Sequence, residues 1–146
     1  MTPTWVGRAT FGLSIAALGV ATYLTVAHYT SPHALVCADN GVVNCTKVTT
    51  SAQSRFLGIP VAVLGVVWAV AMVALCRPAA WRSPRSAIRH ARLGASVLGI
   101  GSVIYLIYAE LVVVRAICLW CTGMHVLVFA LFVLIVLHPE PLPLRQ

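Results

Sequence analysis

Charged residues are scarce in this chain. They make up 9% of its 146 residues, hydrophobic residues make up 60%, and the mean hydropathy is +0.95. A water-soluble globular protein needs a charged surface, so this composition excludes that class and indicates an integral membrane protein. Each membrane-spanning helix needs roughly 20 apolar residues, so the length allows about four such helices and no soluble domain beside them.

Three further features are missing. The chain has no basic patch interleaved with aromatic residues, so its formal charge of +7 does not indicate a nucleic-acid partner. It has no internal repeat, which argues against a repeat architecture. No small-x-small cleavage site follows the first apolar run, where Ala27-His28-Tyr29 is a poor match. That run is also longer than a signal-peptide core of about 7 to 15 residues, so we expect a retained helix.

The four long apolar runs of the sequence predict an all-α integral membrane protein. We expect a bundle of four transmembrane helices with one long extracytoplasmic loop between helices 1 and 2. Only residues 115–117 separate the last two apolar runs, so these two helices should be antiparallel neighbours. Pro60 suits the first turn of the second helix. The glycines at 94, 99 and 101 are expected at helix packing contacts. The predicted spans are residues 8–29, 57–76, 93–114 and 117–138.

The long loop, residues 30–56, carries a pair of cysteines. Asp39-Asn40-Gly41 is a turn signal, which would bring Cys37 and Cys45 towards each other. Asn40 and Asn44 are predicted to be turn residues and not ligands. The stretch 47–56 is predicted to form a short helix on the membrane surface.

The distribution of basic residues predicts the topology. Three of them, Lys47, Arg55 and Arg115, fall on the side of the long loop, and seven fall on the side of both termini. Since basic residues concentrate on the cytoplasmic side, both termini should be cytoplasmic. The seven are Arg8, Arg77, Arg82, Arg85, Arg89, Arg92 and Arg145.

This topology separates the five cysteines. Cys37, Cys45, Cys118 and Cys121 fall on the outer face, where disulfides persist, and Cys76 falls on the inner face. Cys118 and Cys121 form a C-x-x-C pair one turn apart at the start of the fourth helix. A helix N-terminus favours the thiolate there and lowers the thiol pKa.

Three interpretations of the two outer pairs follow from the residues. They are structural staples between the loop and the fourth helix, four thiolate ligands of a structural zinc site, or a disulfide-exchange relay. In the relay, one pair meets a soluble partner and the other meets an electron acceptor dissolved in the lipid. The relay fits best, because a loop pair can reach outwards while a helix-end pair borders the apolar bundle.

Three stretches and one histidine carry a resemblance to a known family. They are Asn44–Val48, Ser54–Pro60 and Cys118–Cys121, with His125 four positions after the last cysteine. In combination they resemble the bacterial branch of the vitamin K epoxide reductase family, and the resemblance covers essentially the whole chain. It implies a quinone-dependent thiol oxidoreductase with a four-helix membrane domain around a quinone, a menaquinone or ubiquinone. Residues 1–146 would then be one catalytic domain without the fused thioredoxin-like domain that many relatives carry.

The resemblance also implies roles for the cysteines. Cys37 and Cys45 would receive electrons from a separate thioredoxin-fold protein outside the cytoplasm, and Cys45 would attack the inner disulfide at Cys118. Cys121 would be the cysteine nearest the quinone. The function implied is extracytoplasmic disulfide formation at the bacterial inner membrane, by direct thiol exchange and without a metal.

Three further residues are candidates for the quinone site. His125 would bind a quinone carbonyl or help to deliver protons, or would donate to a helix carbonyl. Glu110 would serve a proton path or polar packing, or would pair with Arg115. Phe129 would line the isoprenoid tail, or would pack between helices. The competing functions are a zinc- or redox-sensing membrane protein and a structural tetraspan subunit.

Overall fold

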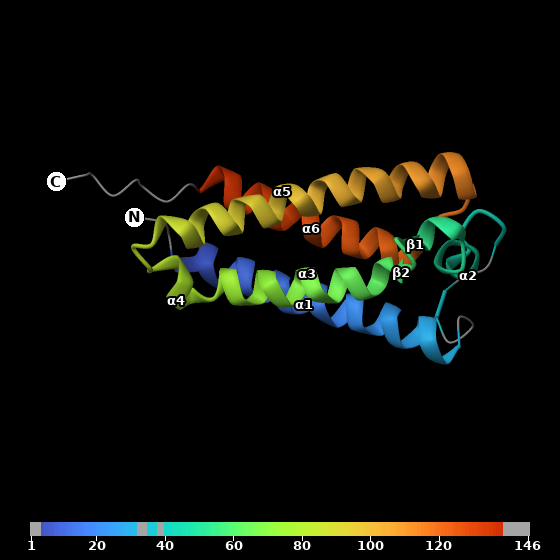
Figure 1. Cartoon of the computed structure of the whole chain (residues 1–146), viewed down its shortest axis with the longest axis horizontal. Coiled ribbons are helices and arrows are strands. Elements are labelled where there is room, and N and C mark those ends of the chain that lie inside the picture. The colour runs from blue at the N-terminus through green and yellow to red at the C-terminus, as the bar shows by residue number, and fades with distance from the viewer. Residues whose placement is uncertain (1–3, 32–34, 38–39, 139–146) are drawn as a thin grey trace.

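Four apolar helices form an elongated bundle in the computed structural model, which describes residues 4–31, 35–37 and 40–138 (Figure 1). The predicted all-α fold class is therefore confirmed. The third helix, α5, continues into a π-helical segment, η3. The bounds are α1 Thr4–Thr30, α3 Val61–Cys76, α5 Ser86–Tyr108, η3 Ala109–Val114 and α6 Leu119–Leu137.

The helices pack around two buried clusters. Helix α1 lies against α3 and α6, and α5 lies against α6 and α3. The short connection after η3 makes α5 and α6 antiparallel neighbours, as predicted (Figure 1). One cluster, which includes Leu24, Cys45 and Cys118, lies at the loop end of the bundle. The other, which includes Met72 and Cys76, lies at the end near the chain termini.

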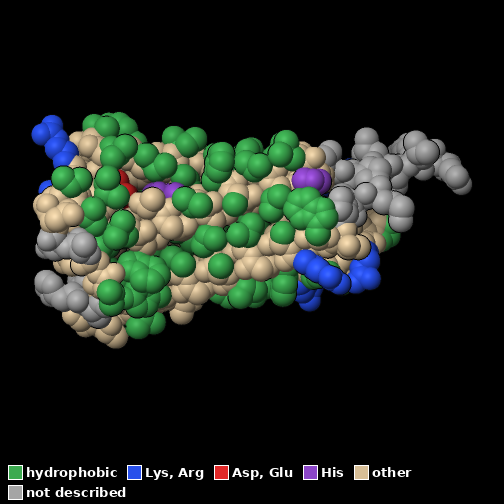
Figure 2. All heavy atoms as spheres, turned by 180° about the vertical axis from the view of Figure 1, so that it is seen from behind, with side chains coloured by type: hydrophobic (Ala, Val, Ile, Leu, Met, Phe, Trp, Pro, Cys, Tyr) green, Lys and Arg blue, Asp and Glu red, His purple; other side chains and the backbone are tan. Residues whose placement is uncertain are grey.

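The outer surface of the bundle suits a lipid environment. Helix α1, the continuous α5–η3 helix and α6 are long and apolar enough to cross a membrane. Helix α3 is shorter at 16 residues, or about 24 Å at the usual helical rise. Figure 2 shows a wide apolar surface with basic side chains gathered towards the ends. The chain is therefore a multi-pass integral membrane protein.

The second helix begins later than the predicted residue 57. A small antiparallel hairpin precedes it, made of β1 (Arg55–Phe56) and β2 (Ile59–Pro60). Leu57 and Gly58 close this hairpin with φ angles of 52° and 83°, in the left-handed region that a helix does not use. Pro60 consequently caps α3 from outside, whereas the sequence predicted it in the first turn.

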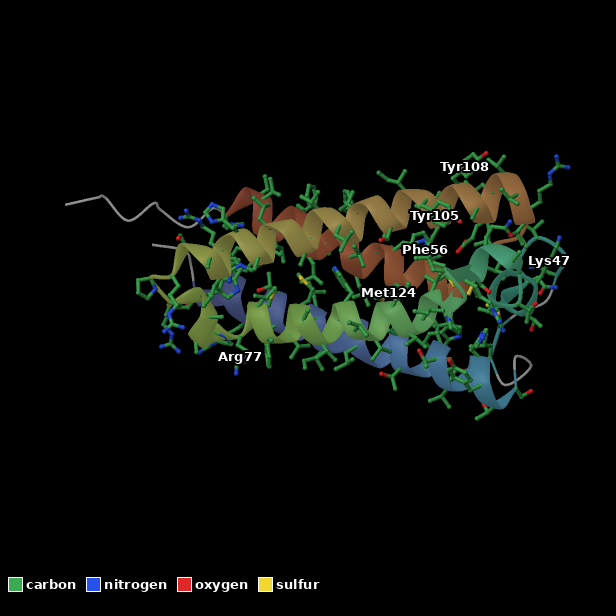
Figure 3. The ribbon with its side chains drawn as sticks, viewed as in Figure 1. Lys47, Phe56, Arg77, Tyr105, Tyr108 and Met124 are labelled. Atoms are coloured by element: carbon green, nitrogen blue, oxygen red, sulfur yellow. A yellow bond between two sulfur atoms is a disulfide. The ribbon has the colours of Figure 1, made fainter. Side chains whose placement is uncertain are left out.

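The segment predicted as one short helix over 47–56 is divided. It holds α2 (Cys45–Thr49), the 3₁₀ turn η2 (Ala52–Ser54) and then strand β1. Helix α2 begins two residues earlier than predicted because the Asn44 side chain caps it, accepting a hydrogen bond from the Lys47 N–H at 2.7 Å. Figure 3 labels Lys47, at the loop end of the bundle.

The connection at the other end is shorter than predicted. It contains the helical turn α4 (Pro78–Trp81), and α5 begins at Ser86 and not near residue 93. Helix extension to this point buries Arg92, which is 1% exposed. Its guanidinium donates to the Leu75 carbonyl at 3.1 Å and lies 3.6 Å from the centre of the Trp81 ring. These contacts allow a charged residue inside the bundle.

Leu57 is predicted to be a position that asparagine improves. Its φ of 52° disfavours leucine, and its side chain is 88% exposed. Asparagine adopts this backbone region more readily, so Leu57→Asn should raise the free energy of unfolding by about 1 kcal/mol. Thermal unfolding in detergent measures the change. Leu57→Ala lacks a polar side chain that could hydrogen-bond to the local backbone and so keeps the penalty. Equal unfolding temperatures for the two variants would contradict the prediction.

A redox site at the loop end of the bundle

The loop cysteines are joined. Cys37 and Cys45 form a disulfide with their Cα atoms 6.1 Å apart. The turn between them is the predicted one at Asn40, whose side-chain oxygen accepts a hydrogen bond from the Val43 N–H at 3.0 Å. Gly41 follows with a φ of 85°, and Asp39 lies outside the described residues. Asn40 is therefore a turn residue, as predicted.

The two members of this disulfide differ in exposure. Cys45 is the first residue of α2 and is 2% exposed. Cys37 is half-buried and packs at the edge of the same cluster. A thiolate arriving from outside the protein therefore reaches Cys37 more easily than Cys45.

Backbone pairing holds the loop against the start of the fourth helix. The N–H of Ile117 donates to the Val42 carbonyl at 2.9 Å, and the N–H of Asn44 donates to the Ile117 carbonyl at 3.0 Å. These bonds form a parallel bridge between Val43 and Ile117. Cys45 and Cys118 follow the paired residues and are buried in one cluster. The two cysteine pairs are thus side by side, although the sequence separates them by more than seventy residues.

The inner pair begins α6 as predicted. Cys118 caps the helix, and its sulfur accepts a hydrogen bond from the Cys121 N–H at 3.3 Å. Both are thiols in this structure. The hydrogen bond from the Cys121 thiol, aided by backbone N–H groups, lowers the pKa of the Cys118 thiol despite its burial. A thiol of lowered pKa is a good leaving group in disulfide exchange.

Glu110 lies directly beneath this pair. It is 6% exposed within η3, and its carboxylate accepts a long hydrogen bond of 3.5 Å from the Cys118 N–H. Its backbone carbonyl accepts the Ala116 N–H at 3.1 Å and so closes the tight connection to α6. An ion pair with Arg115, one of the two alternatives for this carboxylate, does not form.

His125 and Phe129 point in different directions. His125 is 7% exposed, and its Nε2 has no hydrogen-bond partner among the residues that the structure describes. Phe129 is 59% exposed on the outer surface of α6, so the prediction that it packs between helices of this chain is wrong. Residues four positions apart on a helix are rotated by about 40° relative to each other. A line of residues that starts at Cys121 and runs through His125 has therefore rotated to the outer surface of the helix at Phe129. Its contact with an isoprenoid tail stays a prediction.

An apolar groove borders the same helical turn from outside. It has a volume of about 610 Å³ and lies between α1 and α6, where Val20, Trp120 and Val126 are among its lining residues. Because these helix faces meet lipid in a membrane, the groove opens towards the bilayer.

Cys76 is remote from these groups. It is fully buried in the cluster at the other end of the bundle, with Val6 and Met72. Among residues 4–31, 35–37 and 40–138, no group of three or more His, Cys, Asp or Glu side chains could hold a metal ion.

The bundle brings two cysteine pairs together at its loop end, an arrangement that suits thiol–disulfide exchange. A family model independently places the chain. The model of the vitamin K epoxide reductase family matches residues 8–136, so the chain belongs to this family, and the resemblance seen in its motifs is confirmed. Enzymes of the family are quinone-dependent thiol oxidoreductases, which implies a quinone acceptor and a redox partner for this chain. No curated protein matches the chain.

Proposed function

We propose that this chain oxidises a thioredoxin-fold protein outside the cytoplasm and passes the electrons to a membrane quinone. Cys37 and Cys45 receive the electrons, and Cys118 and Cys121 pass them on. The observation that carries this proposal is the bridge between Val43 and Ile117, which holds the two pairs in one buried cluster.

Two exchange steps move the electrons between the pairs. The Cys45 thiolate attacks Cys118 in the inner disulfide, so a Cys45–Cys118 bond forms and Cys121 leaves with the electron pair. The Cys37 thiolate then attacks Cys45, which restores the loop disulfide and releases Cys118. The structure holds a loop disulfide and two inner thiols, which is the arrangement that these steps produce. The lowered pKa of Cys118 favours its departure in the second step.

The residues around Cys121 fit a quinone. A bound quinone supplies an acceptor for two electrons and two protons. The Nε2 of His125 is buried without a partner among the described residues, so it is available to a quinone carbonyl. Glu110 lies beside the thiols and would hold a proton near Cys118. The groove beside Trp120 gives a lipid-soluble acceptor access to this turn from the membrane.

The setting that we propose is the bacterial inner membrane, with both termini in the cytoplasm and the cysteine pairs on the outer side. Seven of the ten basic residues lie on the side of the termini, which supports this orientation. Menaquinone and ubiquinone are the quinones that we propose as acceptors.

The direct test combines the purified protein, a reduced thioredoxin-fold protein and a soluble quinone. Quinone absorbance should fall as the partner's thiols are oxidised, with one quinone consumed per disulfide formed. Quinone absorbance that falls at the same rate with and without the partner would contradict the proposed route.

His125 provides a separate prediction. His125→Phe keeps an apolar ring in the site but removes the nitrogen, so the KM for quinone should rise about tenfold through loss of one hydrogen bond. His125→Gln retains a polar group and should show a smaller rise. Steady-state quinone reduction measures both. An unchanged KM in His125→Phe would assign the histidine to helix packing.

A further inference from the structure

Val36, the residue before Cys37, is held through its backbone. Its N–H donates to the Tyr23 hydroxyl at 3.2 Å, and its carbonyl accepts the Trp120 indole N–H at 3.1 Å. The Val36 side chain contributes little to this attachment, because it is 82% exposed. The two aromatic rings also contact each other, with centroids 4.6 Å apart and planes tilted by 56°.

The two side chains come from rigid elements. Tyr23 lies in α1, and Trp120 lies in the first turn of α6, between Cys118 and Cys121. Trp120 therefore keeps its position relative to the inner cysteine pair. Side chains on helices hold a geometry more closely than side chains on loops.

The loop disulfide is thus attached at both of its ends to one short stretch of chain. Trp120 holds the Cys37 side through Val36, and Ile117 holds the Cys45 side through Val42 and Asn44. The two attachment points flank Cys118.

We propose that Trp120 and Tyr23 are positioning residues that clamp the Val36 backbone and thereby hold the loop cysteines against Cys118. The inference rests on the proposed relay. Thiol–disulfide exchange requires the attacking sulfur close to the disulfide and aligned with it, so holding the loop raises the rate of the steps between the two pairs. The clamp touches no reacting atom and takes no part in the transfer from Cys121 to the quinone.

Two single substitutions each remove a bond to the Val36 backbone and keep the aromatic packing. Trp120→Phe removes the N–H donor to the Val36 carbonyl, and Tyr23→Phe removes the acceptor of the Val36 N–H. Each should lower kcat for partner-driven quinone reduction about fivefold to tenfold, the loss expected from one hydrogen bond. The KM for quinone should stay unchanged in Tyr23→Phe, because Tyr23 is not among the described residues that line the groove. Tyr29→Phe, which alters an exposed tyrosine on the same helix, should retain full activity.

A second assay separates positioning from a general structural role. In a chain carrying Cys37→Ala and Cys45→Ala, dithiothreitol reduces the inner pair directly, and turnover no longer uses the loop. Tyr23→Phe should leave this loop-independent turnover unchanged, after correction for direct reduction of quinone by dithiothreitol. An equal loss in both assays would mean that Tyr23 supports the inner pair or the fold, and would overturn the clamp.

Different results would contradict the proposed function and the proposed clamp. If both phenylalanine variants retain partner-driven kcat within about twofold while Cys45→Ala is inactive, the clamp is wrong and the relay stands. If Cys45→Ala itself retains activity, the relay is wrong and the clamp has no reaction to serve.

Discussion

Cys121→Ala should abolish partner-driven quinone reduction, with a loss of more than about a hundredfold, because the inner pair can then neither form its disulfide nor accept two electrons. Cys118→Ala removes the other half of the same disulfide and should be equally inactive. Quinone absorbance with a reduced thioredoxin-fold protein measures both variants.

The loop cysteines should fail in a distinguishable manner. In Cys45→Ala, Cys37 keeps a thiol that is half-buried and open to the partner but lacks the cysteine that resolves it. When the partner is added in its disulfide form, the Cys37 thiolate should attack it and form a mixed disulfide, while one partner sulfur leaves as a thiolate. This species should be visible as a gel shift that reductant removes. Cys37→Ala leaves only Cys45, which is 2% exposed, and should trap far less partner.

Cys76→Ala is the matched control for the four relay cysteines. Cys76 is fully buried in the cluster at the opposite end of the bundle, where a thiol acts as a small apolar group. Its replacement should leave turnover unchanged. Full activity in Cys121→Ala would remove the basis of the relay, whatever the control shows.

The second large effect is expected at Gly99, where three helices meet. A Cβ atom there would lie 2.8 Å from Cζ2 of Trp68 in α3 and 3.0 Å from Cγ1 of Val128 in α6. The Trp68 ring has little freedom to move, because its indole N–H donates to the Ala95 carbonyl at 2.8 Å. Gly99→Ala should therefore destabilise the fold by about 1–3 kcal/mol, and Gly99→Val by more.

Gly101→Ala and Gly94→Ala are the controls for this prediction. Neither glycine has a heavy atom within 4 Å of an added Cβ, so alanine should be tolerated and should gain up to about 1 kcal/mol of helix propensity. Thermal unfolding in detergent compares the three variants. Equal stability of Gly99→Ala and Gly101→Ala would contradict the close packing of α3, α5 and α6.

The glycines of α5 illustrate which features of the fold could be predicted from the sequence. Composition predicted a helical membrane bundle, and hydrophobic runs located its four helices, because lipid demands long apolar segments. All three glycines were expected at packing contacts, but only Gly99 faces another helix closely. The second helix begins after residue 57 because of the hairpin at Leu57, and α5 extends back to Ser86, where Arg92 contacts Leu75 and Trp81 on neighbouring elements.

In the candidate site, too, some features could be predicted from the sequence and others could not. The turn at Asn40 and the cap at Cys118 were predictable, since both depend on residues close together in sequence. The attachment of Val36 to Tyr23 and Trp120 was not singled out, although a tryptophan between the two cysteines was a visible signal. Packing of Phe129 between helices was predicted from its spacing of four residues from His125, which ignores the drift of a helix face over successive turns.

The amino-acid sequence by itself determined that this is a multi-pass membrane protein of apolar helices and that four of its five cysteines fall at one end of the bundle. These are properties of apolar length and charge, which each segment carries alone. Only the tertiary structure decided that Val43 pairs with Ile117, that Cys45 is buried while Cys37 is half-buried, and that His125 is buried with an Nε2 that has no hydrogen-bond partner among the described residues. Those facts depend on contacts between segments distant in the chain, whose geometry the packing of the whole bundle sets.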